Sequence, residues 1–183
     1  VLAQSVIRKY RPLVIAITGS VGKTSTKDAI YTVLASNGMV RKTAKNYNNE
    51  LGVPLTVLGL EAPGKNPVMW LRAIGRGLSL LASEKSYPKI LILEMGADRV
   101  GDIAYLTKMT EPHIGILTSI GVSHLEKFGS VENIVKEKTT IISSLRSDSL
   151  ALVSIEDPVA ATVVGKTPAR LVTYGCNEHA DIS

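Results

Sequence analysis

The residues with the clearest chemical potential form a glycine-rich run, GSVGKTST, over residues 19–26. Glycines let a loop fold tightly, so that successive backbone N–H groups can point at phosphate oxygens. In such a loop Lys23 would reach the β- and γ-phosphates of a nucleotide, and Thr24 would offer its hydroxyl to Mg²⁺. An incidental glycine-rich turn is the alternative, but the order strand, loop, helix favours a phosphate loop. The predicted nucleotide contacts are Thr18, Gly19, Ser20, Val21, Gly22, Lys23, Thr24 and Ser25.

Two further residues with ligand chemistry follow apolar runs. Glu94 comes directly after KILIL at residues 89–93. A carboxylate at the end of a buried strand is costly unless it is paired or binds a metal, so Glu94 is a candidate Mg²⁺ ligand or a salt-bridged structural residue. His124 follows the apolar run Ile114–Thr118. An isolated histidine is more often structural, but this one follows a strand on the edge where a ligand is expected.

The elements that must position these residues alternate between strands and helices. Apolar runs predict buried strands at Leu13–Thr18, Lys89–Leu93 and Ile114–Thr118, with weaker candidates at Leu150–Ser154 and Leu171–Tyr174. Helical spacing predicts helices at Lys23–Asn37, Pro67–Ser83, Gly101–Lys108 and Val131–Leu145. This alternation predicts an α/β doubly wound fold with a mostly parallel sheet. Ligands of such sheets bind at the carboxyl ends of the strands, where Gly19–Thr24, Glu94–Gly96 and Ser119–His124 fall.

The helix predicted at Pro67–Ser83 has an apolar stripe and a basic face. The stripe consists of Trp70, Leu71, Ile74, Leu78 and Leu81, and the other face of Arg72, Arg76, Ser79 and Ser83. We expect the stripe to pack on the sheet, as in most amphipathic helices. The alternative is a surface helix that makes peripheral contact with a membrane or a partner. The helix is too short to span a bilayer and is interrupted by Gly75 and Gly77.

The composition is that of one globular domain. The chain has 183 residues, 45% of them hydrophobic, 20% charged and only 4% aromatic, which predicts a substantial core of aliphatic side chains. The formal charge of +5 suits an anionic ligand, but the basic residues are not gathered into tracts, so we expect no nucleic-acid partner. The single cysteine, Cys176, can form no internal disulfide. The first twelve residues have no apolar run before their charges, and we expect no signal peptide there.

The phosphate loop has an unusual length. Ile17 stands where the general P-loop pattern has its first glycine, which leaves the shorter form G-x-x-G-K-T. This form, preceded by Thr18, is similar to the loop of the Mur ligases and their folylpolyglutamate synthetase relatives. Four further segments resemble the Mur ligase family: TAKNYNNELGVPLTVL (43–58), LILEMGADRVGDIAYL (91–106), LTSIGVSHLEKFGS (117–130) and VENIVKEKTTI (131–141). The first and third are most similar to the branch that adds D-alanyl-D-alanine.

This resemblance, which covers roughly residues 13–180, assigns roles that the pattern alone leaves open. It implies that Thr24, Glu94 and His124 bind Mg²⁺, with His124 beside a second ion or an acyl phosphate. Lys138, fourteen residues after His124, matches a helix lysine that is often carbamylated in the family. Lys136 is the fallback, and a solvated helix lysine is the structural alternative. The implied catalytic residues are Lys23, His124 and Lys138.

The resemblance also implies a polar substrate contact in the asparagine-rich stretch, through Thr43, Asn46, Asn48 and Asn49. Taken alone, such a stretch is more often a turn. Two positions depart from the family's pattern: Ser119 stands where Asn is usual, and Thr139-Thr140 where Gly-Glu is frequent.

The implied function is an ATP- and Mg²⁺-dependent carboxylate-amine ligase of peptidoglycan precursor synthesis. ATP would phosphorylate the terminal carboxylate of UDP-N-acetylmuramoyl-tripeptide, and the amine of D-alanyl-D-alanine would then displace phosphate. The resemblance implies a cytoplasmic monomer in which residues 1–183 form the central ATP-binding domain, with 1–12 as a lead-in segment. The N-terminal UDP-binding and C-terminal domains would lie outside the chain, so we expect the chain alone to bind nucleotide weakly and to ligate nothing.

Other functions fit parts of the sequence. A folylpolyglutamate or cyanophycin-type ligase would share the ATP-binding domain, although the Asn48-Asn49 stretch argues against it. A nucleotide-binding homologue that has lost ligation is kept open by Ser119 and Thr139-Thr140. The short loop and the lack of a base-specificity motif disfavour a kinase or a GTPase.

Overall fold

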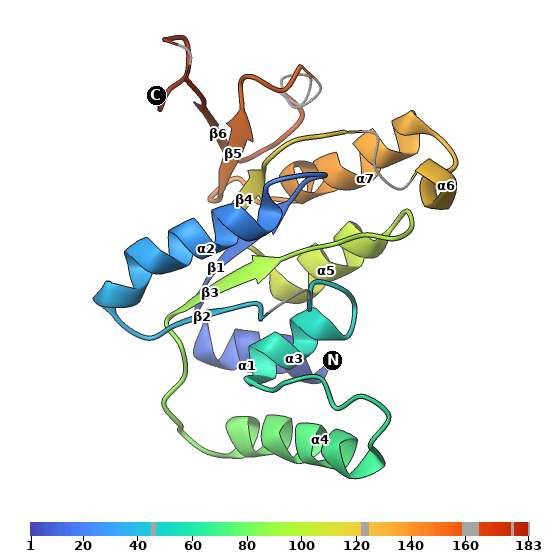
Figure 1. Cartoon of the computed structure of the whole chain (residues 1–183). Helices are drawn as coiled ribbons and strands as arrows, with labels where there is room; N and C mark the ends of the chain where they lie inside the picture. Colours follow the sequence, from blue (N-terminus) through green and yellow to red (C-terminus); the bar gives the residue numbers. More distant parts are fainter. Residues whose placement is uncertain (45–46, 122–124, 159–164, 177, 183) are drawn as a thin grey trace.

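A single parallel sheet organises the chain, seen in a computed structural model of residues 1–183 (Figure 1). The structure describes all residues except 45–46, 122–124, 159–164, 177 and 183. The strands are β1 (Leu13–Thr18), β2 (Val40–Lys42), β3 (Ile90–Glu94), β4 (Ile114–Leu117), β5 (Leu150–Ser154) and β6 (Arg170–Tyr174). Their order is β2-β3-β1-β4-β5-β6, and every neighbouring pair is parallel. The predicted α/β fold is confirmed.

Helices cover both faces of the sheet, as expected of a doubly wound fold (Figure 1). They are α1 (Leu2–Tyr10), α2 (Lys23–Leu34), α3 (Gly52–Leu58), α4 (Pro67–Ala82), α5 (Asp102–Thr110), α6 (Leu125–Phe128) and α7 (Val131–Ser143). Successive strand residues point to opposite faces. Ile15, Ile17 and Ile92 therefore pack toward α2, while Val14 and Leu91 pack toward α1, α3, α5 and α7.

Two helices of the core were not predicted. α1 occupies the expected lead-in segment and buries Ala3, Val6 and Ile7. It has only nine residues, too few for a clear periodic signal. α3 has seven residues, and all but Pro54 are buried. A short helix that is apolar all round shows no helical period, so its sequence resembles a strand or a loop.

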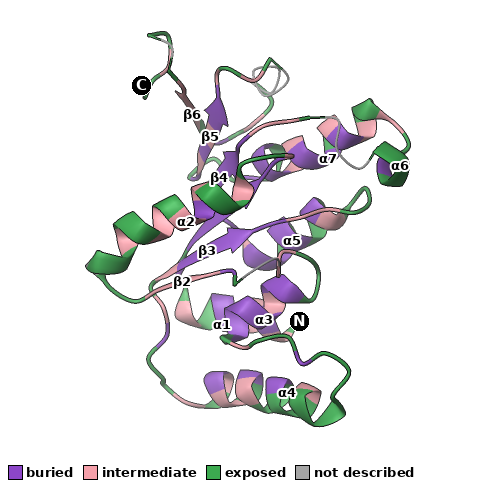
Figure 2. Cartoon of the chain, in the orientation of Figure 1, coloured by how far each residue is buried: buried purple, intermediate pink, exposed green. Residues whose placement is uncertain are grey.

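α4 begins and ends within one residue of the prediction, but the prediction that its apolar stripe packs on the sheet is wrong. The helix lies against α1 and α3, beyond them from the sheet (Figure 1). Its buried residues are Ala73, Gly77 and Leu80, and much of its other side is exposed (Figure 2). Small residues let two helix backbones approach closely, and here they decide which side of α4 faces inward. None of the helices within the described part of the chain combines the length and apolarity needed to cross a bilayer.

Candidate functional site

The phosphate loop connects β1 to α2 in a conformation that glycine makes possible. Gly19 and Gly22 have φ values of 149° and 88°, in the region that side-chain-bearing residues rarely adopt. A Cβ at Gly19 would collide with the Thr118 side chain and the Ser119 backbone. Gly22 is the N-cap of α2, so the loop leads directly to the positive end of that helix.

The segment after β4 holds the loop in place. The backbone N–H of Ser20 donates to the Ser119 carbonyl at 2.7 Å, and the Thr118 hydroxyl donates to the Val21 carbonyl at 2.6 Å. The Ser20 hydroxyl bonds both the carbonyl and the N–H of Gly121, each at 2.9 Å. The Ser119 hydroxyl lies 3.3 Å from the Val21 nitrogen, from which it accepts a hydrogen bond. The residue that departs from the family pattern therefore supports the loop itself.

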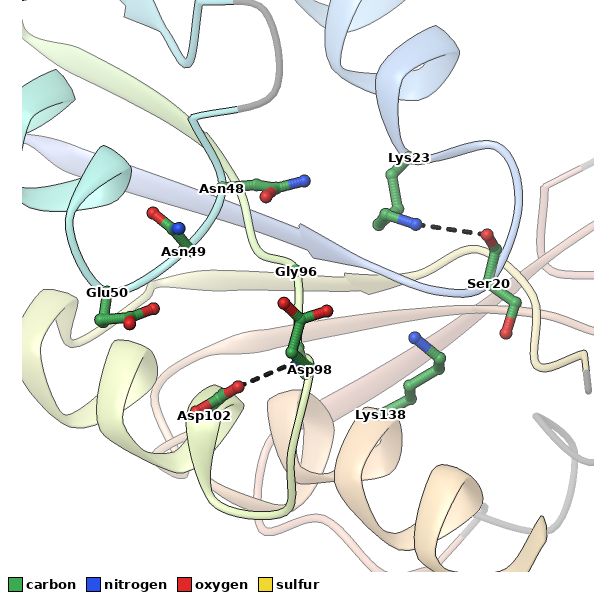
Figure 3. A pocket seen from close by; sticks show the side chains of 10 residues that line it. Ser20, Lys23, Asn48, Asn49, Glu50, Gly96, Asp98, Asp102 and Lys138 are labelled. Carbon is green, nitrogen blue, oxygen red and sulfur yellow. Dashed lines mark hydrogen bonds between the residues drawn. The ribbon is translucent and has the colours of Figure 1, made fainter. Parts of the chain in front are cut away.

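Two lysines meet at the Gly19 carbonyl. Lys23 Nζ donates to it at 2.7 Å and to the Ser20 carbonyl at 3.2 Å, and Lys138 Nζ donates to it at 3.2 Å. Burial, and after it repulsion from Lys23, lower the pKa of Lys138 to about 8, against the attraction of Glu137. The pKa of Lys23 is also lowered, chiefly by burial, with Glu94 opposing the shift. Both lysines line one cavity (Figure 3).

α7 is anchored so that Lys138 faces the loop. The Ser130 side chain caps the helix by accepting a hydrogen bond from the Asn133 N–H at 3.2 Å. Glu137 is buried and accepts from the N–H groups of Gly101 and Ile103, at 2.7 and 2.6 Å, at the start of α5. Lys138 is itself only 3% exposed, so it is not a solvated helix lysine. Lys136, the fallback, is exposed and lies outside this cavity.

Glu94 is the centre of a buried polar cluster. Its Oε2 accepts from the Thr24 hydroxyl at 3.0 Å and from Lys27 Nζ at 3.2 Å, and its Oε1 accepts from the Asn48 amide at 3.1 Å. The cluster brings Thr24 and Glu94 together, so both lie on the same edge of the sheet, as predicted. Lys27 was not predicted, yet it is only 2% exposed. Its position one helical turn after Lys23 places both lysines on the same side of α2, and the structure shows that α2 packs on β3.

Two of the predicted contact residues use their hydroxyls within the fold. Thr18 is fully buried and donates to the Met95 carbonyl at 2.8 Å, which ties the end of β1 to the end of β3. Thr43 is also fully buried, and its hydroxyl accepts from the Glu94 N–H at 3.0 Å. Thr43 thus extends the pairing of β2 with β3 and holds Glu94 by its backbone.

Two of the asparagines in the predicted substrate stretch make hydrogen bonds within the fold, and these two also line the cavity. Asn48 is fixed by its carbonyl, which accepts from the Gly96 N–H at 2.7 Å, while its amide contacts Glu94. Asn49 caps α3 by accepting from the N–H groups of Leu51 and Gly52. Both also line the cavity. Asn46 and His124, which were predicted to bind substrate and metal, lie outside the described residues.

The phosphate loop, the asparagine-rich stretch, the segment after β3 and α7 all contribute to a cavity of about 360 Å³ at the carboxyl ends of β1 and β3. In Figure 3 the two lysines lie on one side of it, and Asn48, Asn49 and Glu50 on the other. The complete lining is Ser20, Lys23, Asn48, Asn49, Glu50, Gly96, Ala97, Asp98, Asp102 and Lys138. We call the segments Gly19–Thr24, Glu94–Gly96 and Thr118–Gly121 the ligand edge.

The side-chain oxygens next to the phosphate loop are of the kind that binds a magnesium ion. Mg²⁺ prefers carboxylate and hydroxyl oxygens, and the Glu94 carboxylate and Thr24 hydroxyl lie side by side where the phosphate loop ends. A closed all-protein metal site is a different arrangement, and the described residues contain no group of three or more His, Cys, Asp or Glu side chains that could form one. An ion shared between these two residues and a phosphate matches the usual magnesium arrangement.

Comparison with known proteins places this geometry in a family. A family model for the Mur ligase middle domain matches residues 17–183. The chain belongs to the Mur ligase family. The UDP-N-acetylmuramoyl-tripeptide--D-alanyl-D-alanine ligase of Bacillus subtilis is 32% identical over 180 residues, which cover 98% of this chain and 34% of that Mur ligase. The enzyme of the same name from Mycobacterium leprae is 36% identical over 159 residues, covering 87% of this chain and 26% of the relative.

Crystal structures of Mur ligases share the fold along almost the whole chain. The MurF ligase of Thermotoga maritima in complex with ADP is 31% identical, with a TM-score of 0.76 over 98% of this chain and 36% of that one. MurF of Acinetobacter baumannii has a TM-score of 0.77 at 26% identity, over 98% of this chain and 34% of that one. The chain thus spans about a third of the length of these relatives. FolC of Escherichia coli, at 20% identity and a TM-score of 0.57, shares the fold alone.

Proposed function

We propose that this chain is the ATP-binding domain of a ligase that joins D-alanyl-D-alanine to UDP-N-acetylmuramoyl-tripeptide. One observation carries the proposal: Lys23 of the glycine-rich loop and the buried Lys138 line one cavity with Asn48 of the asparagine-rich stretch. The Asn48 amide in turn contacts Glu94, which connects this cavity to the Glu94 cluster. The names of the sequence relatives support the choice of substrates, and the Thermotoga maritima complex supports a nucleotide at the loop.

Nucleotide binding would begin at the loop. The N–H groups of the first turn of α2 would donate to phosphate oxygens, and Lys23 would exchange the Gly19 and Ser20 carbonyls for the β- and γ-phosphates. Thr24 and Glu94 would hold Mg²⁺, which when bound screens phosphate charge. Lys27 keeps the Glu94 carboxylate oriented toward Thr24 by its own contact at 3.2 Å. Asn48, on the other oxygen of Glu94, connects this cluster to the substrate side of the cavity.

The ligation would proceed in two displacements. A carboxylate oxygen of the tripeptide attacks the γ-phosphorus of ATP, the bond to the ADP oxygen breaks, and an acyl phosphate forms. The amine nitrogen of D-alanyl-D-alanine then attacks the carbonyl carbon, the bond to the phosphate oxygen breaks, and the amine loses a proton. Two anions must meet in the first step, and the positive charge of Lys23 makes their approach less costly.

Lys138 would take part as a carbamate. A pKa of about 8 leaves part of the amine neutral near neutral pH, and only a neutral amine can attack CO₂. The ammonium group first loses one proton to solvent. The neutral amine then attacks CO₂, so that an N–C bond forms as one C–O π bond opens, and the nitrogen loses a second proton; a cation thus becomes an anion with two protons released. Its place beside the Gly19 carbonyl and Lys23 would let that anion serve as a further magnesium ligand.

The ligation test needs the protein at the length of its relatives, supplied with ATP and pairs of substrates. The proposal predicts phosphate release only when UDP-N-acetylmuramoyl-tripeptide and D-alanyl-D-alanine are both present. Release with a folate and glutamate instead would favour the folylpolyglutamate alternative. Nucleotide binding without release for any pair would favour a homologue that has lost ligation.

A further inference from the structure

α4 turns its small residues and Leu80 toward the protein and most of its other large apolar residues toward solvent. Ala73, Gly77 and Leu80 are buried, and a Cβ at Gly77 would collide with the Leu2 side chain of α1. On the opposite side, four large apolar residues at helical spacing are more than half exposed: Val68, Leu71, Ile74 and Leu78. We call these four the α4 outer face. Surface helices of globular proteins usually show the reverse arrangement, and a contiguous apolar surface often marks an interaction site.

The orientation of α4 is fixed at both ends. Asn66 caps the start of the helix by accepting from the N–H groups of Val68 and Met69 at 2.9 and 3.4 Å. At the other end, Lys9 Nζ donates to three carbonyls that the helix leaves unpaired, at 2.8 to 3.0 Å, and the Tyr10 hydroxyl donates to two of them. The exposure of the outer face is therefore a property of a well-anchored helix.

The charges around the outer face are mostly positive. α4 contains Arg72 and Arg76 but no acidic residue. Over residues 59–89 there are five basic and two acidic side chains, and both acids lie outside the helix, at Glu61 and Glu84. Arg72 is exposed and follows Val68 by four residues, which places it along the rim of the outer face. Lys65 and Lys85 are exposed beyond the two ends of the helix.

We propose that the α4 outer face docks on the surface of an anionic lipid bilayer. A convex helix with a row of aliphatic side chains and a basic rim is suited to lie in the interface, with its apolar side chains at the acyl boundary. The basic rim would then lie among the anionic headgroups, which attract it over about a Debye length. None of the cavity-lining residues belongs to α4, so this docking leaves the ligand edge open to nucleotide.

Contact of α4 with a membrane can be followed by the fluorescence of a tryptophan within this helix. Trp70 is its single tryptophan, and it lies within α4, with its indole N–H donating to the Gly64 carbonyl at 3.1 Å. The probe is a vesicle of phosphatidylglycerol and phosphatidylcholine in equal amounts, compared with phosphatidylcholine alone. We expect co-sedimentation with the anionic vesicles, roughly tenfold weaker partitioning to the neutral ones, and weakening by added salt. Brominated acyl chains in the anionic vesicles should quench the Trp70 fluorescence.

Matched variants distinguish binding through the α4 outer face from nonspecific adsorption of the protein to vesicles. The double variant Leu71→Gln, Leu78→Gln should lower partitioning to anionic vesicles by about tenfold or more, because it removes half of the apolar row. Arg72→Gln should lower it by a few-fold and reduce its dependence on salt. The control is Val33→Gln on α2, where an apolar side chain 69% exposed is replaced far from α4, and partitioning should not change. All of these positions are exposed, so thermal unfolding should be nearly the same in every variant.

Three results would overturn the proposal. The first is an absence of co-sedimentation with anionic vesicles. The second is equal partitioning of the double variant and the Val33→Gln control. The third is a dimer of the unmodified chain in sedimentation equilibrium without lipid that the double variant disperses, since a second copy would then be what covers the outer face.

Discussion

The ligand edge and α4 depart from ordinary packing in opposite directions. Charged side chains in the ligand edge or in contact with it are buried: Lys27, Glu94 and Lys138 are each 2–3% exposed. At α4, apolar side chains are exposed while a glycine and an alanine occupy the interface. A buried charge and an exposed apolar row both cost stability in an isolated domain, so both point to binding. The difference is that the edge compensates its charges internally, whereas the outer face of α4 has no such compensation among the described residues.

The largest effect should follow from breaking that internal compensation. Lys27→Met removes the cation from a buried pair, after which the described residues leave the Glu94 carboxylate with the Thr24 and Asn48 contacts. We expect the free energy of unfolding to fall by about 3 kcal/mol, because an uncompensated buried charge is strongly destabilising. Urea denaturation measures this, and adding Glu94→Gln to the variant should restore part of the loss. A loss below about 1 kcal/mol would mean that the pair is more solvated than its burial indicates.

A smaller effect, of opposite sign, is expected at Lys138. The pKa of Lys138 in the folded state is lowered from 10.5 to about 8. Below pH 8 the folded protein therefore holds a protonated Lys138 in a buried site that disfavours the charge, which lowers its stability. Between pH 8 and about 10.5 the unfolded chain binds more protons than the folded one, and stability rises with pH. Lys138→Met should therefore be more stable than the unmodified chain at pH 7, by about 1–2 kcal/mol after the lost hydrogen bond is counted.

The measurement for Lys138 is urea denaturation across pH in CO₂-free buffer. The advantage of Lys138→Met should shrink as pH rises above 8, be lost before pH 10.5, and stop changing above about that pH. An advantage that does not depend on pH would contradict the lowered pKa. In ¹³C-bicarbonate, ¹³C NMR should show a carbamate signal that Lys138→Met abolishes and Lys136→Ala preserves.

The smallest expected change in the free energy of unfolding comes from glycine-to-alanine substitutions on the two sides of α4. Gly75 has nothing within 4 Å of an added Cβ, whereas Gly77 meets Leu2. Gly75→Ala should raise the free energy of unfolding by about 0.5–1 kcal/mol through helix propensity. Gly77→Ala should gain nothing or lose about 1 kcal/mol, because the crowding at Leu2 offsets that gain. Equal stabilisation by both would show that α4 does not pack closely on α1.

The sequence was informative where one physical effect dominates. The run Leu13–Thr18 is apolar and mostly β-branched, and it forms β1 with the predicted bounds. Thr24 and Glu94 could be placed together because the carboxyl ends of parallel strands share one edge. Lys27 was missed because a helix lysine usually lies in solvent, and only the third dimension shows that its side of α2 faces Glu94.

The prediction that the apolar stripe of α4 packs on the sheet was wrong for a different reason. Periodicity identified its large apolar residues, but it carries no information on how closely two helices can approach. Ala73 and Gly77 allow that approach, so they face inward together with Leu80, while Val68, Leu71, Ile74 and Leu78 face outward. The cap that Asn49 provides to α3 was missed for a related reason, since α3 was not predicted as a helix.

The most direct test of the central claim is Mg-ATP binding to this chain, measured by calorimetry for the unmodified protein, Lys23→Ala and Lys136→Ala. Both variants remove one lysine charge, but only Lys23 contacts the loop, and Lys136 is an exposed residue of α7. We expect weak binding by the unmodified chain, the same affinity for Lys136→Ala, and no detectable binding for Lys23→Ala at nearly unchanged thermal stability. Equal affinity in all three proteins would contradict the assignment of residues 19–24 as the phosphate loop.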